Sequence, residues 1–383
     1  MSPELPLLHI LRDEIRACGP LSFHCFMDLC LYHPQHGYYN SARVKLGAAG
    51  DFYTSAHLAP VFARLLARHF VEVWHVLGDP SPFDLVELGP GDGLLACELL
   101  PWMNQRFPEL SSCVHYTGIE QSAPLRDRVE QRLRFFAGRA RILENLPALA
   151  PAPGGERFRG CIFANEFFDA LPVHLLVWRG GRWQERYVTL EGEKLVWAEG
   201  PPSLPSLAKE AELYFDSGLV REEREEGWMA EIRPLAAPWM QKLGQCLSRG
   251  ELIVVDYGYT LEEWRQGRFP SGSALAYRHH QVVYDLLAHS GDQDMTAHVN
   301  FSQLIDAGRQ SGFSVRNLQS QEKFLMEIGQ KDEFGDLFAD CSSEAERLRR
   351  AQSLKTLLMP QGMGEAFRVL VLEKVQQAPT PGI

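Results

Sequence analysis

Long apolar stretches are absent from this sequence of 383 residues. No run of about eighteen uninterrupted apolar residues occurs, although a membrane-spanning helix needs that length. Charged residues, 23% of the total, interrupt the apolar ones throughout. A helix that spans a membrane is therefore excluded, and the 45% of hydrophobic residues can instead bury one large core and a second, smaller one.

A secretory signal and a disulfide framework are missing as well. Residues Met1 to Ile15 lack the basic start and the long apolar centre of a secretory signal. The eight cysteines show no repeating spacing, and a chain of this size needs no disulfides to be stable. We therefore expect reduced thiols and a cytoplasmic location.

Positive charge is scarce. Lys and Arg number 38 against 49 Asp and Glu, so the net charge is -11. Proteins that bind the phosphate backbone need clustered positive charge to displace counterions. We therefore expect no nucleic-acid partner, whereas an acidic surface is compatible with a basic protein substrate.

The sequence also lacks a recognisable metal-binding pattern. Cys25, Cys30, His33 and His36 lie close together along the chain, but their spacings match no ordinary zinc-binding pair. Cys25 and Cys30 fit an apolar helix instead. No metal site is expected.

What the sequence does contain is an alternation of apolar runs and helical patterns. Four runs rich in β-branched residues are each followed by a polar or glycine-rich break, as in buried parallel strands. Apolar residues at helical spacing lie between the first pairs of runs, which predicts a doubly wound α/β sheet. The strands are Phe83 to Leu88, Val114 to Ile119, Cys161 to Ala164 and Leu252 to Val255, and the helices are Leu94 to Phe107 and Pro124 to Phe136.

The pattern changes after Val255. A polar segment to Asn300 is followed by a helix at Phe301 to Ser311 and by strands near Phe313 to Leu318 and Phe367 to Leu372. These last two strands can pair as an antiparallel edge on the parallel sheet. The expected fold is therefore an α/β, Rossmann-like sheet with an antiparallel edge strand.

Two segments interrupt the alternation. Apolar strands flank a Gly180-Gly181 turn near the start of 173–250, which predicts a hairpin and an inserted α+β subdomain. Helices at Leu5 to Ala17 and Ser22 to Leu31 form an N-terminal cap. We expect the cap and a cofactor-covering loop in 1–60, the two halves of the Rossmann-like domain in 61–172 and 251–375, the insertion in 173–250, and a flexible tail in 376–383.

A glycine loop after the first strand, Val86 to Gly93, predicts a ligand site. Glycines at 89, 91 and 93 allow a tight turn and let a ligand approach the backbone beside a helix N-terminus. A glycine-rich turn that binds nothing is the alternative, because a glycine fingerprint alone is weak evidence.

The charge of this loop selects the ligand. A dinucleotide loop has the spacing G-x-G-x-x-G, whereas here the third glycine comes one residue earlier. Pro90 offers no N–H, and Asp92 would repel a pyrophosphate. S-adenosylmethionine carries an ammonium and a sulfonium, so carboxylates such as Glu87 and Asp92 suit it. The loop therefore predicts S-adenosylmethionine, held through Glu87, Gly89 and Gly91.

Polar residues after the next strands extend this predicted site. Glu120 follows the second strand, where a carboxylate can accept hydrogen bonds from both ribose hydroxyls. It could instead cap the following helix. Glu144 and Asn145 follow a short third strand near Arg141 to Leu143, where they could meet the adenine edge.

The fourth strand runs into Asn165, Glu166 and Asp169, flanked by two aromatic residues. Ligands of open α/β sheets bind outside the carboxyl ends of the strands. A group transferred from the bound S-adenosylmethionine would therefore lie here. Glu166 could otherwise be only a helix cap. Asn165, Glu166 and Asp169 are therefore the candidate catalytic residues.

Several strings of residues are informative beyond single positions. They are Leu31 to Tyr39, Gly50 to Ser55, Glu87 to Gly91, Asn165 to Pro172, Asp256 to Gly258 and Asp294 to Val299. Together these strings resemble the MidA family, the arginine methyltransferases linked to assembly of mitochondrial complex I. They occur in the family's order and cover most of the chain, from about Phe26 to Gly329.

The resemblance implies a class I methyltransferase fold and methylation of an arginine on a partner protein, for which a complex I subunit is one candidate. It places Asp51, Thr54 and Ser55 near the methionine moiety of the cofactor, and Asn165 and Glu166 beside the transferred methyl group. It also makes His298, within the last string, a further catalytic candidate. Two departures stand out: Asp92 replaces an arginine of the family, and Ser273-Ala274-Leu275 replaces Gly-Thr-Leu.

The chemistry of arginine fits two of these residues. A guanidinium keeps its proton in proteins, so carboxylates must orient it and stabilise its charge during transfer. Glu166 and Asp169 are the best pair for that task. Two other functions stay open: a scaffolding factor that binds the cofactor and holds a partner through the insertion, and a nicotinamide-dependent oxidoreductase, which the glycine spacing disfavours.

Overall fold

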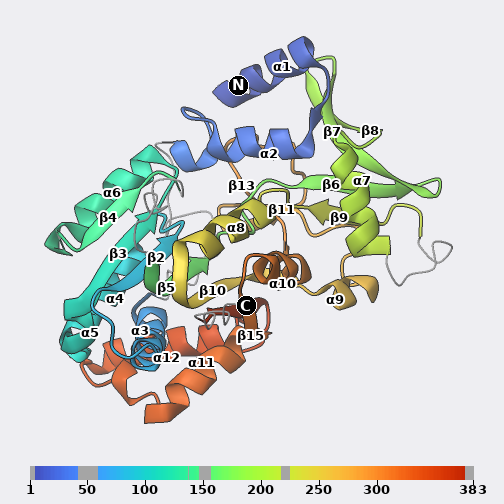
Figure 1. The fold of residues 1–383 in the computed structure, drawn as a ribbon. Coiled ribbons are helices and arrows are strands. Elements are labelled where there is room, and N and C mark those ends of the chain that lie inside the picture. The colour runs from blue at the N-terminus through green and yellow to red at the C-terminus, as the bar shows by residue number, and fades with distance from the viewer. Residues whose placement is uncertain (1–4, 42–58, 137, 146–156, 217–224, 376–383) are drawn as a thin grey trace, which may run out of the picture. The chain divides into compact units, whose positions relative to one another are not determined.

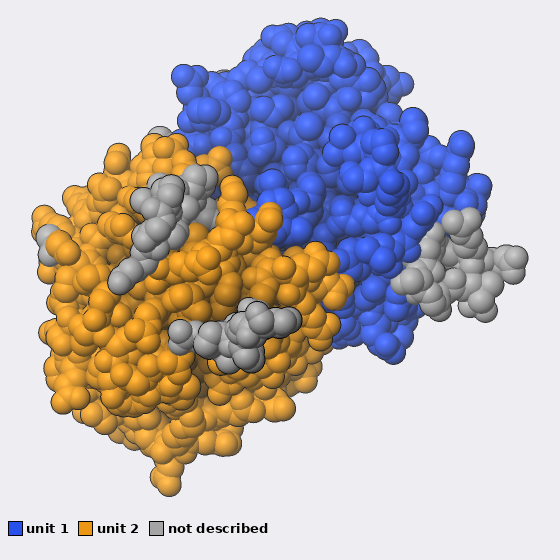
Figure 2. Space-filling view, viewed as in Figure 1, with its two compact units in different colours: residues 1–52, 168–238, 259–304 blue, residues 53–167, 239–258, 305–383 orange. Residues whose placement is uncertain are grey.

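The computed structural model describes residues 5–41, 59–136, 138–145, 157–216 and 225–375 (Figure 1). The chain divides into two compact units, each made of three segments, which Figure 2 shows in different colours. Unit 1 comprises Met1–Phe52, Phe168–Pro238 and Tyr259–Leu304, and unit 2 comprises Tyr53–Phe167, Trp239–Gly258 and Ile305–Ile383.

Unit 2 contains a largely parallel sheet with two strands of changed direction at one side. Five neighbouring strands are parallel, β16 pairs antiparallel with β10, and β15 pairs antiparallel with β16. The sheet therefore has the predicted antiparallel pair at its edge. In spatial order the strands are β15 (Ser314–Ser320), β16 (Phe367–Lys374), β10 (Leu247–Tyr259), β5 (Phe158–Asn165), β2 (Phe83–Leu88), β3 (Val114–Ile119) and β4 (Ala140–Leu143).

The strands of this sheet could be predicted from the sequence because their side chains are buried on both faces of the sheet. β2 and β3 have the bounds expected from their apolar runs. β5 and β10 extend beyond Cys161 to Ala164 and Leu252 to Val255, because backbone pairing continues where the side chains become polar. The predicted helices occur as α4 (Leu94–Arg106), α6 (Ala123–Leu133) with the turn η3 (Arg134–Phe136), and α10 (Phe301–Gln310).

Helix α3 (Ala59–Val76), which has no counterpart in the sequence prediction, provides much of the core on one face of this sheet. Phe62 and Phe70 of α3 contact Phe163 of β5, with ring centroids 6.3 and 6.4 Å apart. Residues of α11 (Gln321–Gly329) and α12 (Glu344–Leu358) join the same core. On the other face, Gly308 of α10 lies against Met240 of α8 (Ala236–Cys246) and Leu372 of β16.

Unit 1 contains the predicted hairpin within an antiparallel sheet whose strands differ in length. Arg179 pairs with Arg182, and the two glycines between them have φ of +54° and +76°, as a tight two-residue turn requires. The strands are β1 (Leu21–Ser22), β7 (Arg182–Glu191), β6 (His174–Arg179) and β9 (Met229–Ile232) in that order, with β8 (Lys194–Gly200) on β7. The helix α7 (Pro205–Ala211) follows β8, and α9 (Leu261–Arg265) follows β10.

The N-terminal helices of unit 1 occur within a residue of their expected bounds, as α1 (Pro6–Cys18) and α2 (Phe23–Tyr32). Leu7, Leu11 and Ile15, four residues apart, form the buried face of α1. The turn η1 (Tyr38–Asn40) follows α2. Residues expected to be only a polar segment form a small sheet of β12 (Gln281–Val283), β11 (Leu275–Arg278) and β13 (Asp294–Thr296).

Among the helices of the described residues, none is long and apolar enough to span a membrane. All eight cysteines are free. Within the same described ranges, no three His, Cys, Asp or Glu side chains lie so as to hold a metal ion.

Candidate functional site

The glycine loop follows β2 in unit 2 and has a shape that only glycine adopts easily. Gly89, Gly91 and Gly93 have φ of +64°, +59° and +76°. The N–H of Gly89 donates to the carbonyl of Ile119, and that of Gly93 to the carbonyl of Pro90, both at 2.9 Å. The loop is thereby held against the carboxyl end of β3 and leads directly into α4.

Glu87 is the acidic residue at the end of β2. Its side chain is buried, and one carboxylate oxygen accepts a 2.6 Å hydrogen bond from the hydroxyl of Tyr116. Burial raises the pKa of Glu87 to about 7, and the negative charges of Glu120 and Asp92 act in the same direction. A cation nearby would stabilise the ionised form of this carboxyl group.

Glu120 lies beside the glycine loop. Its carboxylate accepts hydrogen bonds from the N–H of Gly91 at 3.2 Å and from the N–H of Ser122 at 2.8 Å. Burial raises its pKa to about 7, although these bonds oppose the shift. The N-cap of α6 is Ser122, whose hydroxyl accepts from the N–H of Leu125, so Glu120 holds this capping residue and the glycine loop rather than capping the helix itself.

Asp92, which departs from the family pattern, is balanced by a local cation. One of its carboxylate oxygens accepts from the N–H of Leu94, at the start of α4, at 3.2 Å. The other lies 2.9 Å from the guanidinium of Arg132 on α6. The negative charge of Asp92 is thus used in capping the helix and in an ion pair.

Asn165 and Glu166 lie at the carboxyl end of β5, also in unit 2. Glu166 has φ of +51°, a conformation that costs energy in a residue with a side chain and is frequent at functional sites. Its N–H donates to the carbonyl of Val255, and the amide of Asn165 donates to one carboxylate oxygen of Glu166 at 3.0 Å. The buried Oδ1 of Asn165 accepts no hydrogen bond from the residues that the structure describes.

Asp169 belongs to unit 1. It is 6% exposed, and its carboxylate accepts a 2.8 Å hydrogen bond from the hydroxyl of Thr296. Burial raises its pKa, while the bond from Thr296 and the charge of Arg233 lower it in part. The N–H of Ala297 also donates to the backbone carbonyl of Asp169, at 3.2 Å.

Two tyrosines join this region of unit 1. The hydroxyl of Tyr32 donates to the carbonyl of Ala170 at 2.9 Å, and that of Tyr39 to the carboxylate of Asp294 at 2.8 Å. The strings Leu31 to Tyr39 and Asp294 to Val299 therefore meet the segment that begins at Phe168. None of these contacts was predicted, although each tyrosine and Thr296 lies in a string that carried the resemblance.

His298 packs its ring edge-on against Phe269, with centroids 4.6 Å apart. Burial lowers its pKa to about 4, and the charges of Arg268 and Arg233 add to the effect, so the imidazole is neutral near pH 7. The backbone N–H of His298 donates to the hydroxyl of Ser273 at 2.9 Å. The serine that departs from the family pattern thus fixes the backbone of His298.

The structure brings the predicted residues together in two groups, one in each unit. Glu144 and Asn145 are exposed and follow β4, whose Leu143 accepts a 2.9 Å hydrogen bond from the N–H of Glu120. Asp51, Thr54 and Ser55 lie outside the described residues. Unit 2 holds Glu87, Gly89, Gly91, Glu120, Asn165 and Glu166 at the ends of neighbouring strands, and unit 1 holds Asp169 and His298.

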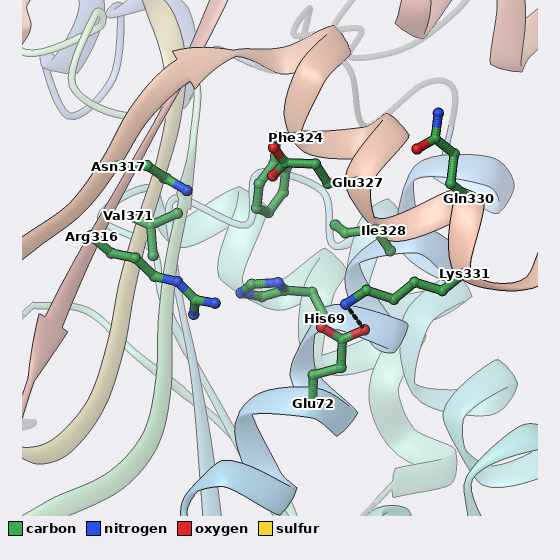
Figure 3. Close-up of a pocket in the computed structure, with 10 residues that line it drawn as sticks. All are labelled: His69, Glu72, Arg316, Asn317, Phe324, Glu327, Ile328, Gln330, Lys331 and Val371. Atoms are coloured by element: carbon green, nitrogen blue, oxygen red, sulfur yellow. Dashed lines mark ion pairs between the residues drawn. The ribbon is translucent and has the colours of Figure 1, made fainter.

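Unit 2 also has a cavity of about 510 Å³ away from these strand ends, between α3, β15, β16 and α11. Figure 3 shows Arg316 and Lys331 reaching into it from different elements, with His69 between them in this view. Lys331 pairs with Glu72 at 2.5 Å, and Arg316 pairs with Glu251. These charges are matched within the unit, so the cavity adds nothing to the predicted site.

Known proteins resemble nearly the whole chain. Proteins named protein arginine methyltransferase NDUFAF7, mitochondrial, are 28% identical over 393 residues in Rattus norvegicus and 29% identical over 395 residues in Bos taurus. Each match covers 96% of this chain, and 84% and 83% of the relatives. The crystal structure of a Burkholderia thailandensis protein bound to S-adenosyl-homocysteine is 27% identical, with a TM-score of 0.80, and the match covers 97% of this chain and 92% of that chain. This likeness confirms the predicted fold class.

The expected cytoplasmic location is contradicted by these relatives, which are named as mitochondrial proteins. The residues at the start of the sequence do not identify a compartment. Reduced thiols do not identify a compartment either, so neither observation could support the cytoplasm in particular.

A family model described as "Putative S-adenosyl-L-methionine-dependent methyltransferase" matches residues 65–319, more than half of the chain. The matched range includes the glycine loop, Glu120 and the segment from Asn165 to Asp169. It confirms the cofactor that the charge of the loop predicted. The chain therefore belongs to this family of S-adenosyl-L-methionine-dependent methyltransferases.

Proposed function

We propose that this methyltransferase acts on an arginine side chain of a partner protein. The observation that carries the proposal is the shared name of the curated relatives, protein arginine methyltransferase, over 96% of this chain. The resemblance to the MidA family adds a subunit of respiratory complex I as a partner to test.

The cofactor-binding residues are proposed on their chemistry. When bound, S-adenosylmethionine supplies an electrophilic methyl group on a positively charged sulfur. Burial keeps the pKa of both Glu87 and Glu120 near 7, so a cation beside them is favoured. Glu120 would accept hydrogen bonds from the ribose, and the buried Oδ1 of Asn165 is a ready acceptor for a donor group.

Other parts of this site follow from their positions. Gly89 and Gly91 would let the cofactor approach the loop backbone, since neither has a side chain. Glu144 or Asn145 would lie at the adenine edge, and the resemblance assigns Asp51, Thr54 and Ser55 to the methionine moiety.

The acceptor arginine requires carboxylates. Its guanidinium stays charged, since its pKa lies far above neutral pH, so one of its nitrogens must be turned towards the methyl group and must give up a proton as it is methylated. Asp169, oriented by Thr296, is proposed to hold it through a charge-assisted hydrogen bond. Glu166, oriented by Asn165, is a separate candidate for the same task. The neutral His298 is a further candidate for contact with the substrate.

Transfer of labelled methyl groups tests the proposal. The purified protein is incubated with S-adenosylmethionine labelled in the methyl group and with extract from cells that lack this enzyme. We expect label on arginine of a protein, and none with Gly91→Val as the matched control. Label on lysine, on a small molecule or on nothing would contradict arginine methylation.

A further inference from the structure

Arg233 is a buried cation in unit 1 that the sequence did not single out. It follows β9 and is only 3% exposed. Its guanidinium donates to three backbone carbonyls: Nη2 to Ala297 at 2.7 Å, Nε to Leu171 at 3.3 Å and Nη1 to His298 at 3.5 Å. One side chain therefore ties the segment after Asp169 to the segment that contains His298.

The same two segments are joined a second time by Asp169 itself. Its carboxylate accepts from the hydroxyl of Thr296, and its carbonyl accepts from the N–H of Ala297. The carbonyl of Ala297 in turn accepts the shortest of the three bonds from Arg233 named above. Hydrogen bonds thus link Arg233 to Ala297 and Ala297 to Asp169. Together they fix the backbone of Asp169, from which its side chain extends.

We propose that Arg233 is a positioning residue that holds the Asp169 carboxylate in place and in its ionised form for the guanidinium of the substrate. The substrate named here rests on the proposed arginine methylation. The planar guanidinium of Arg233 suits the task because it can donate to several carbonyls at fixed angles, which an ammonium group on a flexible stem cannot do equally well.

The charges around Asp169 make the contribution of Arg233 specific. Burial raises the pKa of Tyr39, and the charges of Asp294, to which its hydroxyl donates, and of Asp169 raise it further. Thr296 contributes a neutral donor. Arg233 is the cation among these groups that lowers the pKa of Asp169, against burial, which raises it. Its removal leaves the carboxyl group more readily protonated.

Two substitutions separate the two parts of the role. Arg233→Lys keeps the positive charge but loses most of the carbonyl contacts, so we expect kcat to fall about tenfold to a hundredfold. The pH at which kcat of Arg233→Lys declines on the acidic side should be the same as in the unaltered enzyme. Arg233→Met loses the charge as well, so this decline should move to higher pH. Arg265→Lys, which alters another carbonyl-bonded arginine of unit 1, is the control and should match the unaltered enzyme.

A titration that does not depend on activity completes the test. The carboxyl carbon of Asp169 is followed by NMR in protein labelled with ¹³C-aspartate, and Asp169→Asn identifies its signal. We expect Arg233→Met to shift this titration to higher pH and Arg233→Lys to leave it nearly unchanged, with both variants folded by circular dichroism. An unchanged titration in Arg233→Met would overturn the role of Arg233, whereas absence of methylarginine with the unaltered enzyme would overturn the proposed function and its substrate.

Discussion

The hydroxyl of Tyr116 donates a 2.6 Å hydrogen bond to the carboxylate of Glu87, across the neighbouring strands β3 and β2. This bond lowers the pKa of Glu87, against burial, which raises it to about 7. The phenol of Tyr116 thus helps to keep the carboxylate of Glu87 ionised.

Tyr116→Phe should weaken the binding of S-adenosylmethionine. Without the hydroxyl, Glu87 is protonated to a greater extent near pH 7 and attracts the cationic cofactor less. Loss of one hydrogen bond to a charged group predicts about tenfold weaker affinity in calorimetry. Unaltered affinity would show that Glu87 has no part in holding the cofactor.

Cofactor affinity should rise with pH between about 5.5 and 7.5. Glu87 and Glu120 both have pKa values raised to about 7 by burial, so they lose their protons in this range. The ionised forms attract the cation and accept from the ribose, so binding should also release protons. Calorimetry in two buffers that differ in ionisation enthalpy measures that release, and Glu120→Gln should reduce it.

The same carboxylates affect folding in the opposite sense. Their folded pKa values lie above the ordinary value of 4.5, so their contribution to stability is fully present below that pH and is lost as the pH rises through about 7. S-adenosylmethionine should therefore stabilise the protein against denaturant more strongly at pH 7.5 than at pH 5.5. An equal effect at both pH values would speak against this linkage.

Gly91→Val should abolish cofactor binding while destabilising the protein about as much as a control substitution at another glycine of positive φ. Gly91 has φ of +59° in the loop and donates its N–H to Glu120, so a branched side chain strains the turn and fills the approach to the backbone. Gly78→Val is the matched control, since Gly78 has φ of +82° and open space around its Cα. The inference fails if both variants bind the cofactor equally.

The elements that could be predicted from the sequence are those whose apolar side chains are buried along their whole length. The runs at Phe83 to Leu88 and Val114 to Ile119 are apolar on both faces, so their strands have the expected bounds. Helix α3 was not predicted, although its buried apolar residues recur at helical spacing. The short strand β13, Asp294–Thr296, has too few residues for any periodicity to be visible.

The site was predictable as far as neighbouring strands of a parallel sheet determine it. Glu87, Glu120 and Asn165 each end a strand, so their proximity follows from topology. The contacts of Asp169 did not follow, because Thr296 and Arg233 approach it from 127 and 64 residues away in sequence. Arg233 in particular stands in no motif, and only its burial and its three carbonyl partners point to it.

The two candidate carboxylates should be separable from the cofactor site. Asp169→Asn and Glu166→Gln each remove a charge that is proposed to orient the guanidinium, so each should lower kcat at least a hundredfold. S-adenosylmethionine affinity should change little in Asp169→Asn. Glu210→Gln, which alters another partly buried carboxylate of unit 1, is the control and should remain active. Full activity of Glu166→Gln beside an inactive Asp169→Asn would mean that Glu166 does not orient the substrate.

Glu251→Gln should destabilise unit 2 without affecting cofactor binding. Glu251 is 5% exposed and lies 2.7 Å from the Nε2 of His69, and it also pairs with Arg316. Although burial alone would raise its pKa, these two partners lower it. The substitution removes the carboxylate that bonds to His69 and leaves Arg316 paired with Glu373, which should cost about 2 kcal/mol in the free energy of unfolding near pH 7.

The pH dependence identifies the source of that loss. A lowered pKa means that the contribution of Glu251 is present above its unfolded pKa, near the ordinary value of 4.5, and disappears as the pH falls through the lower folded value. The difference in unfolding free energy between the two proteins, measured with urea, should therefore shrink below about pH 4.5. A difference that stays constant from pH 7 to pH 4 would instead indicate a packing defect, because such a defect does not titrate.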